Sequence, residues 1–198
     1  KLGFGARADL PMSAISEGVM PNKAWKQASY QKDWVIGDTI NASIGQGYVL
    51  ATPLQLAVMA ARIASGTEVD PRIIHSINDT PVPVEPAPSL GLDGSVLRAV
   101  QLGMFEVMNG AQGTGKGARI ADETMQMCGK SGTAQVRNIS SSEREGGVIT
   151  NDRLPWKQRD HALFVAFAPA DNPKYAVSVV VEHGSSGSGT AGPIARDA

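Results

Sequence analysis

Apolar residues gather in four segments of the chain, and their spacing predicts two helices followed by two strands. In TPLQLAVMAARIASG, Thr52 is suited to cap a helix that begins at Pro53, and Gly66 is suited to end it. Only Gln55 and Arg62 are strongly polar in between, and seven residues apart they share one face of the helix. This helix is therefore expected to be buried.

A second helix is predicted from roughly Asp93 to Asn109, because apolar residues recur there at helical spacing and Gly110 follows the last turn. Its apolar stripe consists of Val96, Val100, Met104, Val107 and Met108. We expect this stripe to pack against the core.

Two strands complete the pattern, HALFVAFAP at residues 161–169 and YAVSVVVEH at residues 175–183, joined by the turn-rich ADNPK. Almost every position in them is apolar, so both are expected to be central strands that are covered on both faces. Helices followed by an antiparallel sheet predict the α+β fold class.

The remaining segments carry weaker patterns. Residues 1–50 are rich in Gly, Pro, Lys and Trp with little periodicity, which favours irregular structure wrapped on a core. Residues 70–77 are suited to a short strand. Residues 137–160, called the polar loop below, form a long charged stretch, and we predict that this loop is mobile.

Composition narrows the class of protein. Hydrophobic residues make up 42% and charged residues 19% of the 198 residues, which is typical of a soluble globular domain. The net charge of -1 indicates no general attraction to nucleic acid, so no nucleic-acid partner is expected. No apolar run approaches the ~18 residues that span a bilayer. The single Cys128 excludes an internal disulfide, and the three histidines lack metal-ligand spacing, so no metal site is expected.

Three short motifs match catalytic patterns but stand in the wrong context. Gly110–Gly117 nearly matches a phosphate-binding loop, but a helix precedes it instead of a strand, and the final hydroxyl is missing. Ser29 and Lys32 have the spacing of a serine nucleophile and its lysine base, but their flanks are polar and aperiodic. Ser76–Asn78 matches S-x-N and runs into a Pro-rich loop. We expect a flexible connector, a solvated loop and a turn at these places.

The segment KSGT at residues 130–133 interrupts the predicted strand MQMCGKSGTAQV with a cation, two hydroxyls and a glycine, a combination suited to binding an anion. Lys130 supplies a positive charge, while Ser131 and Thr133 supply hydroxyls for a carboxylate. Gly132 lets a substrate strand lie against the backbone, and the Thr133 N–H is suited to an oxyanion hole. K-[ST]-G is the third signature of penicillin-recognising serine acyl-transferases.

The surrounding segments resemble the transpeptidase domain of class B penicillin-binding proteins. The segments LGFGARADLP, EGVMPNKAWK, GDTINASIGQGYVLATPLQLAVMAARIASG, GKSGTAQV and GPIAR occur in the order of that family. The resemblance covers essentially all 198 residues, and SIGQGYVLATPLQLA is similar to the elongation-specific branch.

The resemblance implies the penicillin-binding and serine β-lactamase-like fold and a peptidoglycan D,D-transpeptidase. Such an enzyme cross-links stem peptides ending in D-Ala-D-Ala through an acyl-serine, is acylated by β-lactams and needs no cofactor. The family works at the periplasmic face of the inner membrane, is anchored by an N-terminal helix, and acts beside a membrane glycan polymerase. The implied site residues are Lys130 and Thr133, both catalytic and substrate-binding, with Ser131 and Gly132 binding substrate.

The family's S-x-x-K and S-x-N motifs precede the stretch that LGFGARADLP matches. Residues 1–198 are therefore expected to form the C-terminal portion of a single transpeptidase domain, with the nucleophile before Lys1 and not at Ser29. These residues alone are expected to be inactive. Two alternatives of the same fold are a serine β-lactamase, which would need a device for deacylation, and a non-catalytic β-lactam sensor.

Overall fold

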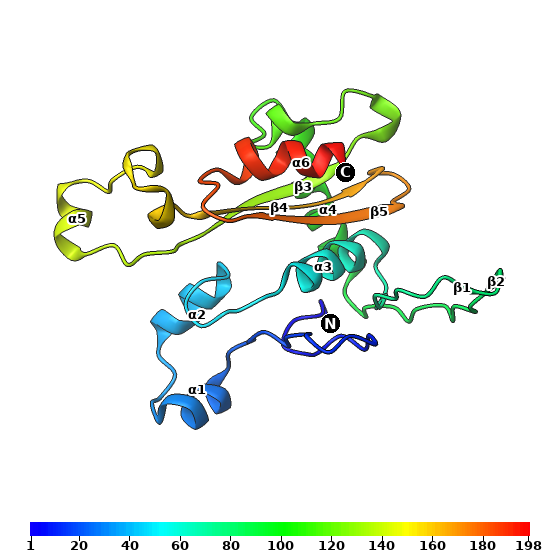
Figure 1. Ribbon diagram of the computed structural model, residues 1–198, viewed down its shortest axis with the longest axis horizontal. Helices are drawn as coiled ribbons and strands as arrows, with labels where there is room; N and C mark the ends of the chain where they lie inside the picture. Colours follow the sequence, from blue (N-terminus) through cyan, green and yellow to red (C-terminus); the bar gives the residue numbers. More distant parts are fainter.

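The computed structural model describes all 198 residues and is built around one antiparallel sheet of three strands (Figure 1). The strands are β3 (Cys128–Ala134), β4 (His161–Ala168) and β5 (Tyr175–Val181), in the spatial order β3-β4-β5. Gly132 lies opposite Leu163, which in turn lies opposite Val180. With the helices around this sheet, the predicted α+β class is confirmed.

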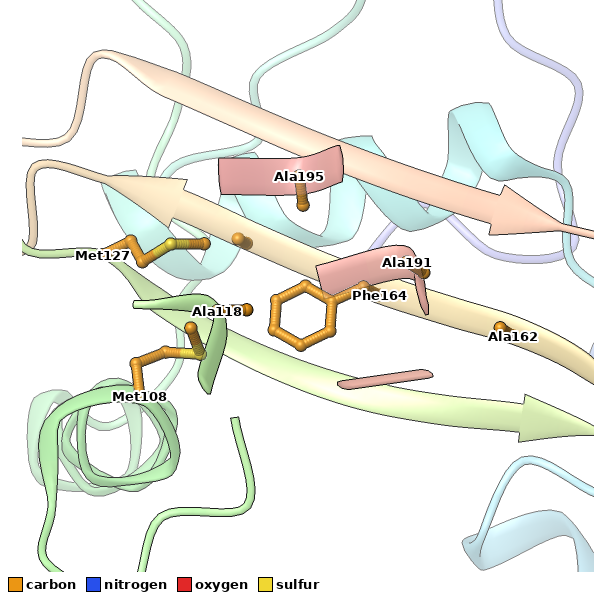
Figure 2. Close-up of a cluster of buried hydrophobic side chains, with 8 residues drawn as sticks. Met108, Ala118, Met127, Ala162, Phe164, Ala191 and Ala195 are labelled. Carbon is orange, nitrogen blue, oxygen red and sulfur yellow. The ribbon is translucent and has the colours of Figure 1, made fainter. Parts of the chain in front are cut away.

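Strand β4 is buried on both faces, as predicted. Ala162, Phe164 and Ala166 face a cluster on the side of the short helix α6 (Gly192–Asp197). Figure 2 shows the Phe164 ring at the centre of this cluster. The full cluster also contains Met108, Ala118, Met127, Ala191 and Ala195. On the opposite face Phe167 packs with Ile63, Met104 and Cys128.

For β5 the prediction of a central strand is wrong. This strand pairs with β4 alone, and the side chains of Tyr175 and Val180 are 68% and 38% exposed. The apolar run reflects Val177, Val179 and Val181, which pack against the cluster on the α6 side of the sheet. The helix α3 (Pro53–Ser65) crosses the sheet below β4 and β5 in Figure 1 and packs on the opposite face. An apolar run reports burial of side chains, and it does not reveal how many strand neighbours the backbone has.

Helix α3 has the predicted boundaries because both of its ends are capped locally. The Thr52 side chain accepts a hydrogen bond from the Gln55 N–H at 3.1 Å, and Gln55 Oε1 accepts one from the Thr52 N–H at 3.0 Å. Gly66 ends the helix with φ 71°. The side chain of Gln55, only 4% exposed, also donates to the carbonyls of Ala6 and Glu17. The polar face of α3 thus binds the N-terminal segment, and most of its other side chains are buried or half-buried.

Helix α4 (Gly94–Asn109) is confirmed, but its predicted apolar stripe is only partly correct. Met104 and Met108 are buried, whereas Val96 and Val100 are 56% and 43% exposed. The face turned to the core instead includes Leu97 and Phe105, together with Gln101, whose amide donates to the Ile63 carbonyl at 2.8 Å. Two apolar stripes were available on this helix, and packing against α3 and β3 selected one.

The prediction of irregular structure for residues 1–50 is wrong for two short helices, α1 (Lys23–Tyr30) and α2 (Ile36–Ser43). The buried Lys26 of α1 forms an ion pair with Asp38 of α2. The rings of Trp25, Tyr30 and Tyr48 also gather, with centroids 5.0 to 5.6 Å apart. Helices of eight residues are marginal alone, so these contacts, which no local pattern reveals, stabilise them.

The other elements are short. Strands β1 (Ser76–Ile77) and β2 (Thr80–Pro81) form a hairpin that projects away from the sheet (Figure 1). The polar loop contains helix α5 (Ser141–Gly146) and the 3-10 turns η3 (Asn151–Arg153) and η4 (Trp156–Gln158). Two more 3-10 turns are η1 (Lys116–Ala118) and η2 (Glu123–Met125), and a π-helical turn, η5 (Gly187–Ala191), precedes α6. None of the helices has the length and hydropathy needed to cross a membrane.

Candidate active-site strand

Strand β3 passes from the core to the surface within a few residues. Cys128 and Gly129 are buried, and a Cβ on Gly129 would lie 2.8 Å from the Phe164 ring and 3.1 Å from the Met108 sulfur. Lys130, Gly132 and Thr133 are exposed, and Ser131 is half-buried. The strand pairs with β4 on one edge only, so its second half presents an open edge to an extended peptide.

The backbone groups of β3 alternate between β4 and the open edge, as in any antiparallel ladder. The Ser131 carbonyl accepts a hydrogen bond from Lys130 Nζ at 2.7 Å, which puts this carbonyl on the open side. By the same alternation, the N–H of Thr133 points to the open edge, while the Gly132 carbonyl points toward Leu163 on β4. The open edge therefore offers the Thr133 N–H as a free donor.

Lys130 is the cation at this edge. It takes part in none of the four ion pairs of the structure, and its ammonium group has donors left after the bond to Ser131. Gly132 adds no side chain beside it, and the hydroxyls of Ser131 and Thr133 lie on the same short stretch. The predicted site residues are thus accessible together on one strand, an arrangement that can hold a carboxylate and an oxyanion.

The polar loop adjoins this site, because it leaves the end of β3 and returns at the start of β4. Arg137 donates to both carboxylate oxygens of Glu143 at 2.7 and 2.6 Å, and these bonds lower the pKa of Glu143 to about 2. Asn151 and Asp160 exchange two further hydrogen bonds. A cavity of about 430 Å³ lies inside the loop. Its lining is formed by Gln135, Arg137, Ile139, Val148, Ile149, Thr150, Asn151, Leu154 and Asp160. The predicted mobility of the loop stays a prediction.

The structure does not bring the rejected serine motifs into a catalytic arrangement. Ser29 is exposed near the end of α1, and Gln31 with φ 54° separates it from Lys32, so the two do not share a helical turn. Ser76 lies in the exposed β1–β2 hairpin, where Asn78 has φ 47°. The expected turn at Ser76–Asn78 is confirmed, whereas Ser29 lies in a helix and not in the predicted loop.

Two further sequence features also have structural roles. Gly110–Gly117 folds back on α4, where the Gly115 N–H donates to the Val107 carbonyl at 2.9 Å, and no strand precedes it. Burial raises the pKa of the Cys128 thiol to about 11, so the thiol stays protonated and acts as a small buried hydrophobe, as expected.

Sequence reasoning missed the close approach of Gly187 to β3. This glycine lies in the stretch GSSGSGT, where three glycines in six residues signal a backbone that passes near another element. A Cβ on Gly187 would lie 2.5 Å from the Gly132 carbonyl oxygen, which shows that η5 crosses the KSGT segment directly.

Comparison with known proteins gives consistent results. The family model described as the penicillin binding protein transpeptidase domain matches residues 1–198. The peptidoglycan D,D-transpeptidase MrdA of Haemophilus influenzae is 36% identical over 200 residues, which cover 98% of this chain and 30% of that protein. MrdA of Escherichia coli is 34% identical over 193 residues, covering 94% of this chain and 30% of that protein.

Solved structures agree with the sequence relatives. The crystal structure of Pseudomonas aeruginosa PBP2 in complex with WCK 5153 superposes with a TM-score of 0.80 at 39% identity, covering 98% of this chain and 40% of that one. The complex between PBP2 and MreC from Helicobacter pylori gives a TM-score of 0.79 at 31% identity, covering 98% and 32%. The predicted transpeptidase fold is confirmed, and the chain spans about three tenths of the length of the curated relatives it matches. The chain therefore belongs to the penicillin-binding protein transpeptidase domain family, as the KSGT strand and its surroundings predicted.

Proposed function

We propose that this chain is part of an elongation-specific peptidoglycan D,D-transpeptidase and supplies its substrate-binding strand. The main support for this proposal is the open edge of β3, which exposes Lys130 and the Thr133 N–H. The chain also belongs to the transpeptidase domain family. An extended stem peptide adds to this edge as a further strand. Lys130, Ser131 and Thr133 then bind the terminal carboxylate, and Gly132 leaves room for the peptide backbone.

The reaction has two acyl transfers. A serine hydroxyl attacks the carbonyl of the penultimate D-Ala, the C–N bond breaks, and the terminal D-Ala leaves with the serine proton on its nitrogen. An amine of a neighbouring stem peptide then attacks the acyl-serine, the ester C–O bond breaks, and the serine recovers a proton. In both steps the Thr133 N–H stabilises the oxyanion, a contact of about 3 kcal/mol in the transition state. The ammonium group of Lys130 places a positive charge beside the serine.

The serine itself belongs to residues that precede Lys1 in this proposal, and residues 1–198 form the C-terminal portion of one transpeptidase domain. The proposal rests on the family order of motifs and on the exposed, separated positions of Ser29 and Lys32. Residues 1–198 on their own therefore have no activated serine.

We also infer the setting from the relatives. The MrdA relatives are peptidoglycan D,D-transpeptidases, which supports a role in the cell wall. The proposal places the enzyme at the periplasmic face of the inner membrane, with an N-terminal anchor, a role in cell shape and no cofactor. The partners in this proposal are stem peptides ending in D-Ala-D-Ala, β-lactams, and a glycan polymerase of the elongation machinery. The Helicobacter pylori relative forms a complex with MreC.

Labelling with a fluorescent penicillin tests the proposal. The full-length enzyme is expected to be labelled stoichiometrically and to release D-Ala from a stem peptide, whereas residues 1–198 alone stay unlabelled. Rapid hydrolysis of a chromogenic β-lactam would identify a β-lactamase, and labelling without D-Ala release would identify a sensor. Labelling of the isolated fragment at Ser29 would refute our assignment of the nucleophile.

A further inference from the structure

After β5 the chain turns back across β3 and β4 through residues 184–191, called the return segment here, before α6 begins. Its end is part of the core, because Ala191 lies beside Phe164 (Figure 2). Its beginning is held by the Ser185 N–H, which donates to the Asp160 carbonyl at 3.0 Å, and by the Thr190 hydroxyl, which donates to the Gly184 carbonyl at 2.8 Å. The return segment is therefore fixed at both ends over the strand pair.

Gly187 is the point of closest approach between the return segment and the sheet. A Cβ at this position would lie 2.5 Å from the Gly132 oxygen, 2.6 Å from the Leu163 oxygen and 3.0 Å from the Gly132 nitrogen. All three are backbone atoms, which cannot rotate aside as a side chain can. Gly187 has no positive φ, so the need for glycine comes from this approach and not from its own conformation.

On the face of the sheet that Gly187 approaches, no side chain of Gly132 or Leu163 covers the backbone. Leu163 alternates with the buried Ala162 and Phe164 and so directs its side chain to the α3 face. Gly132 pairs with Leu163, and a Cβ on Gly132 would lie 3.5 Å from the Leu163 Cβ, on that same face. The Gly132 carbonyl and the Thr133 N–H belong to the same planar peptide group. Any tilt of this carbonyl out of the sheet plane, away from the return segment, therefore tilts the N–H at the open edge by the same angle.

We propose that Gly187 is a positioning residue for the oxyanion hole, because its backbone supports the peptide group that carries the Thr133 N–H. This inference rests on the proposed function, in which that N–H is an oxyanion donor. A donor of this kind must be held within a few tenths of an ångström to be effective, and a rigid backbone contact from behind provides such a support.

The experiment compares Gly187→Ala with the matched control Gly192→Ala in the full-length enzyme. A Cβ on Gly192 crowds the same layer, but it meets side chains, Ala118 at 2.9 Å and the Phe164 ring at 3.3 Å, and not β3. Stopped-flow acylation by a chromogenic β-lactam separates the non-covalent dissociation constant from the acylation rate constant k2, and thermal unfolding is recorded in parallel. We expect Gly187→Ala to lower k2 at least about tenfold and to change the dissociation constant less than about threefold.

Gly192→Ala is expected to keep k2 within about twofold of the wild-type value at a comparable loss of Tm. Equal k2 values for the two variants, or an effect of Gly187→Ala on the dissociation constant alone, would overturn the inference.

If Gly187→Ala does not fold, Thr190→Val is the deciding variant, because it removes the hydroxyl anchor of the return segment without adding a clash. We expect its k2 to fall about threefold, and an unchanged k2 overturns the inference. A wild-type enzyme that is not acylated at all would refute the proposed function itself, so the two failures are distinguishable.

Discussion

Replacing Gly129 by alanine would place a methyl group against the Phe164 ring, where β3 leaves the core. The new Cβ would lie 2.8 Å from one ring carbon and 3.1 Å from the Met108 sulfur. Met108 is flexible enough to move, but Phe164 is 1% exposed and is enclosed by residues of α4, η1 and η5, so the clash with the ring is not easily relieved.

The magnitude follows from two opposing effects. Overpacking of this kind costs roughly 1–3 kcal/mol. Alanine has less conformational freedom than glycine in the unfolded chain, and this difference stabilises the folded state by about 0.5–1 kcal/mol. We therefore expect Gly129→Ala to lower the free energy of unfolding of the transpeptidase domain by about 1.2 kcal/mol. The shift in Tm is about 2–4 °C per kcal/mol for 150–250 residues and less for the larger complete domain, so we expect a fall of at most about 5 °C.

A double-mutant cycle with Phe164→Leu in the full-length enzyme is the assay, with urea unfolding as the measurement. The leucine removes the ring atom that clashes, at a cost of about 1–1.5 kcal/mol alone. The double variant should then be about as stable as Phe164→Leu, a coupling of at least about 1 kcal/mol. If the two losses add to within about 0.4 kcal/mol, the clash with Phe164 is not the cause and the reasoning fails.

Three further substitutions test the site and the polar loop. Gly132→Ala should leave Tm nearly unchanged, because its Cβ would meet one neighbour at an ordinary 3.5 Å, yet slow acylation by obstructing the open edge; a large loss of Tm would contradict this reading. Lys130→Ala should slow acylation at least about 100-fold without a loss of Tm, because the side chain is exposed, and unchanged acylation would refute its assigned role. Glu143→Gln should speed tryptic cleavage after Arg144 at pH 7, because the ion pair with Arg137 is lost. That ion pair lowers the pKa of Glu143 from 4.5 to about 2, so its contribution is complete above pH 4.5 and is lost as the pH falls through about 2. If the wild-type loop already loses its protection against cleavage near pH 5, the ion pair of Glu143 with Arg137 is not what protects it.

The parts of the fold that the sequence predicted correctly are those that depend on neighbouring residues. The ends of α3 follow from the Thr52–Gln55 capping box and from Gly66, all within the helix or next to it. The same holds for α4, which Asp93 caps and Gly110 follows. The burial of β4 on both faces also follows from its own residues, because a strand that is apolar at nearly every position must be covered on both faces.

The errors arose where distant contacts decide the outcome. The helices α1 and α2 exist because Lys26 pairs with Asp38 and because aromatic rings from separate segments meet. The buried face of α4 and the edge position of β5 were likewise decided by neighbours, since each segment offers an apolar surface that more than one packing can use.

For the site, the sequence by itself determined the chemistry: a cation, two hydroxyls and a glycine on one strand, because these side chains carry their functional groups wherever the chain places them. Only the tertiary structure decided that the strand has an open edge, that Thr133 turns its N–H toward this edge, and that Gly187 supports the same peptide group from behind. Strand pairing and backbone approach join residues far apart in the chain, and their geometry depends on how whole elements pack.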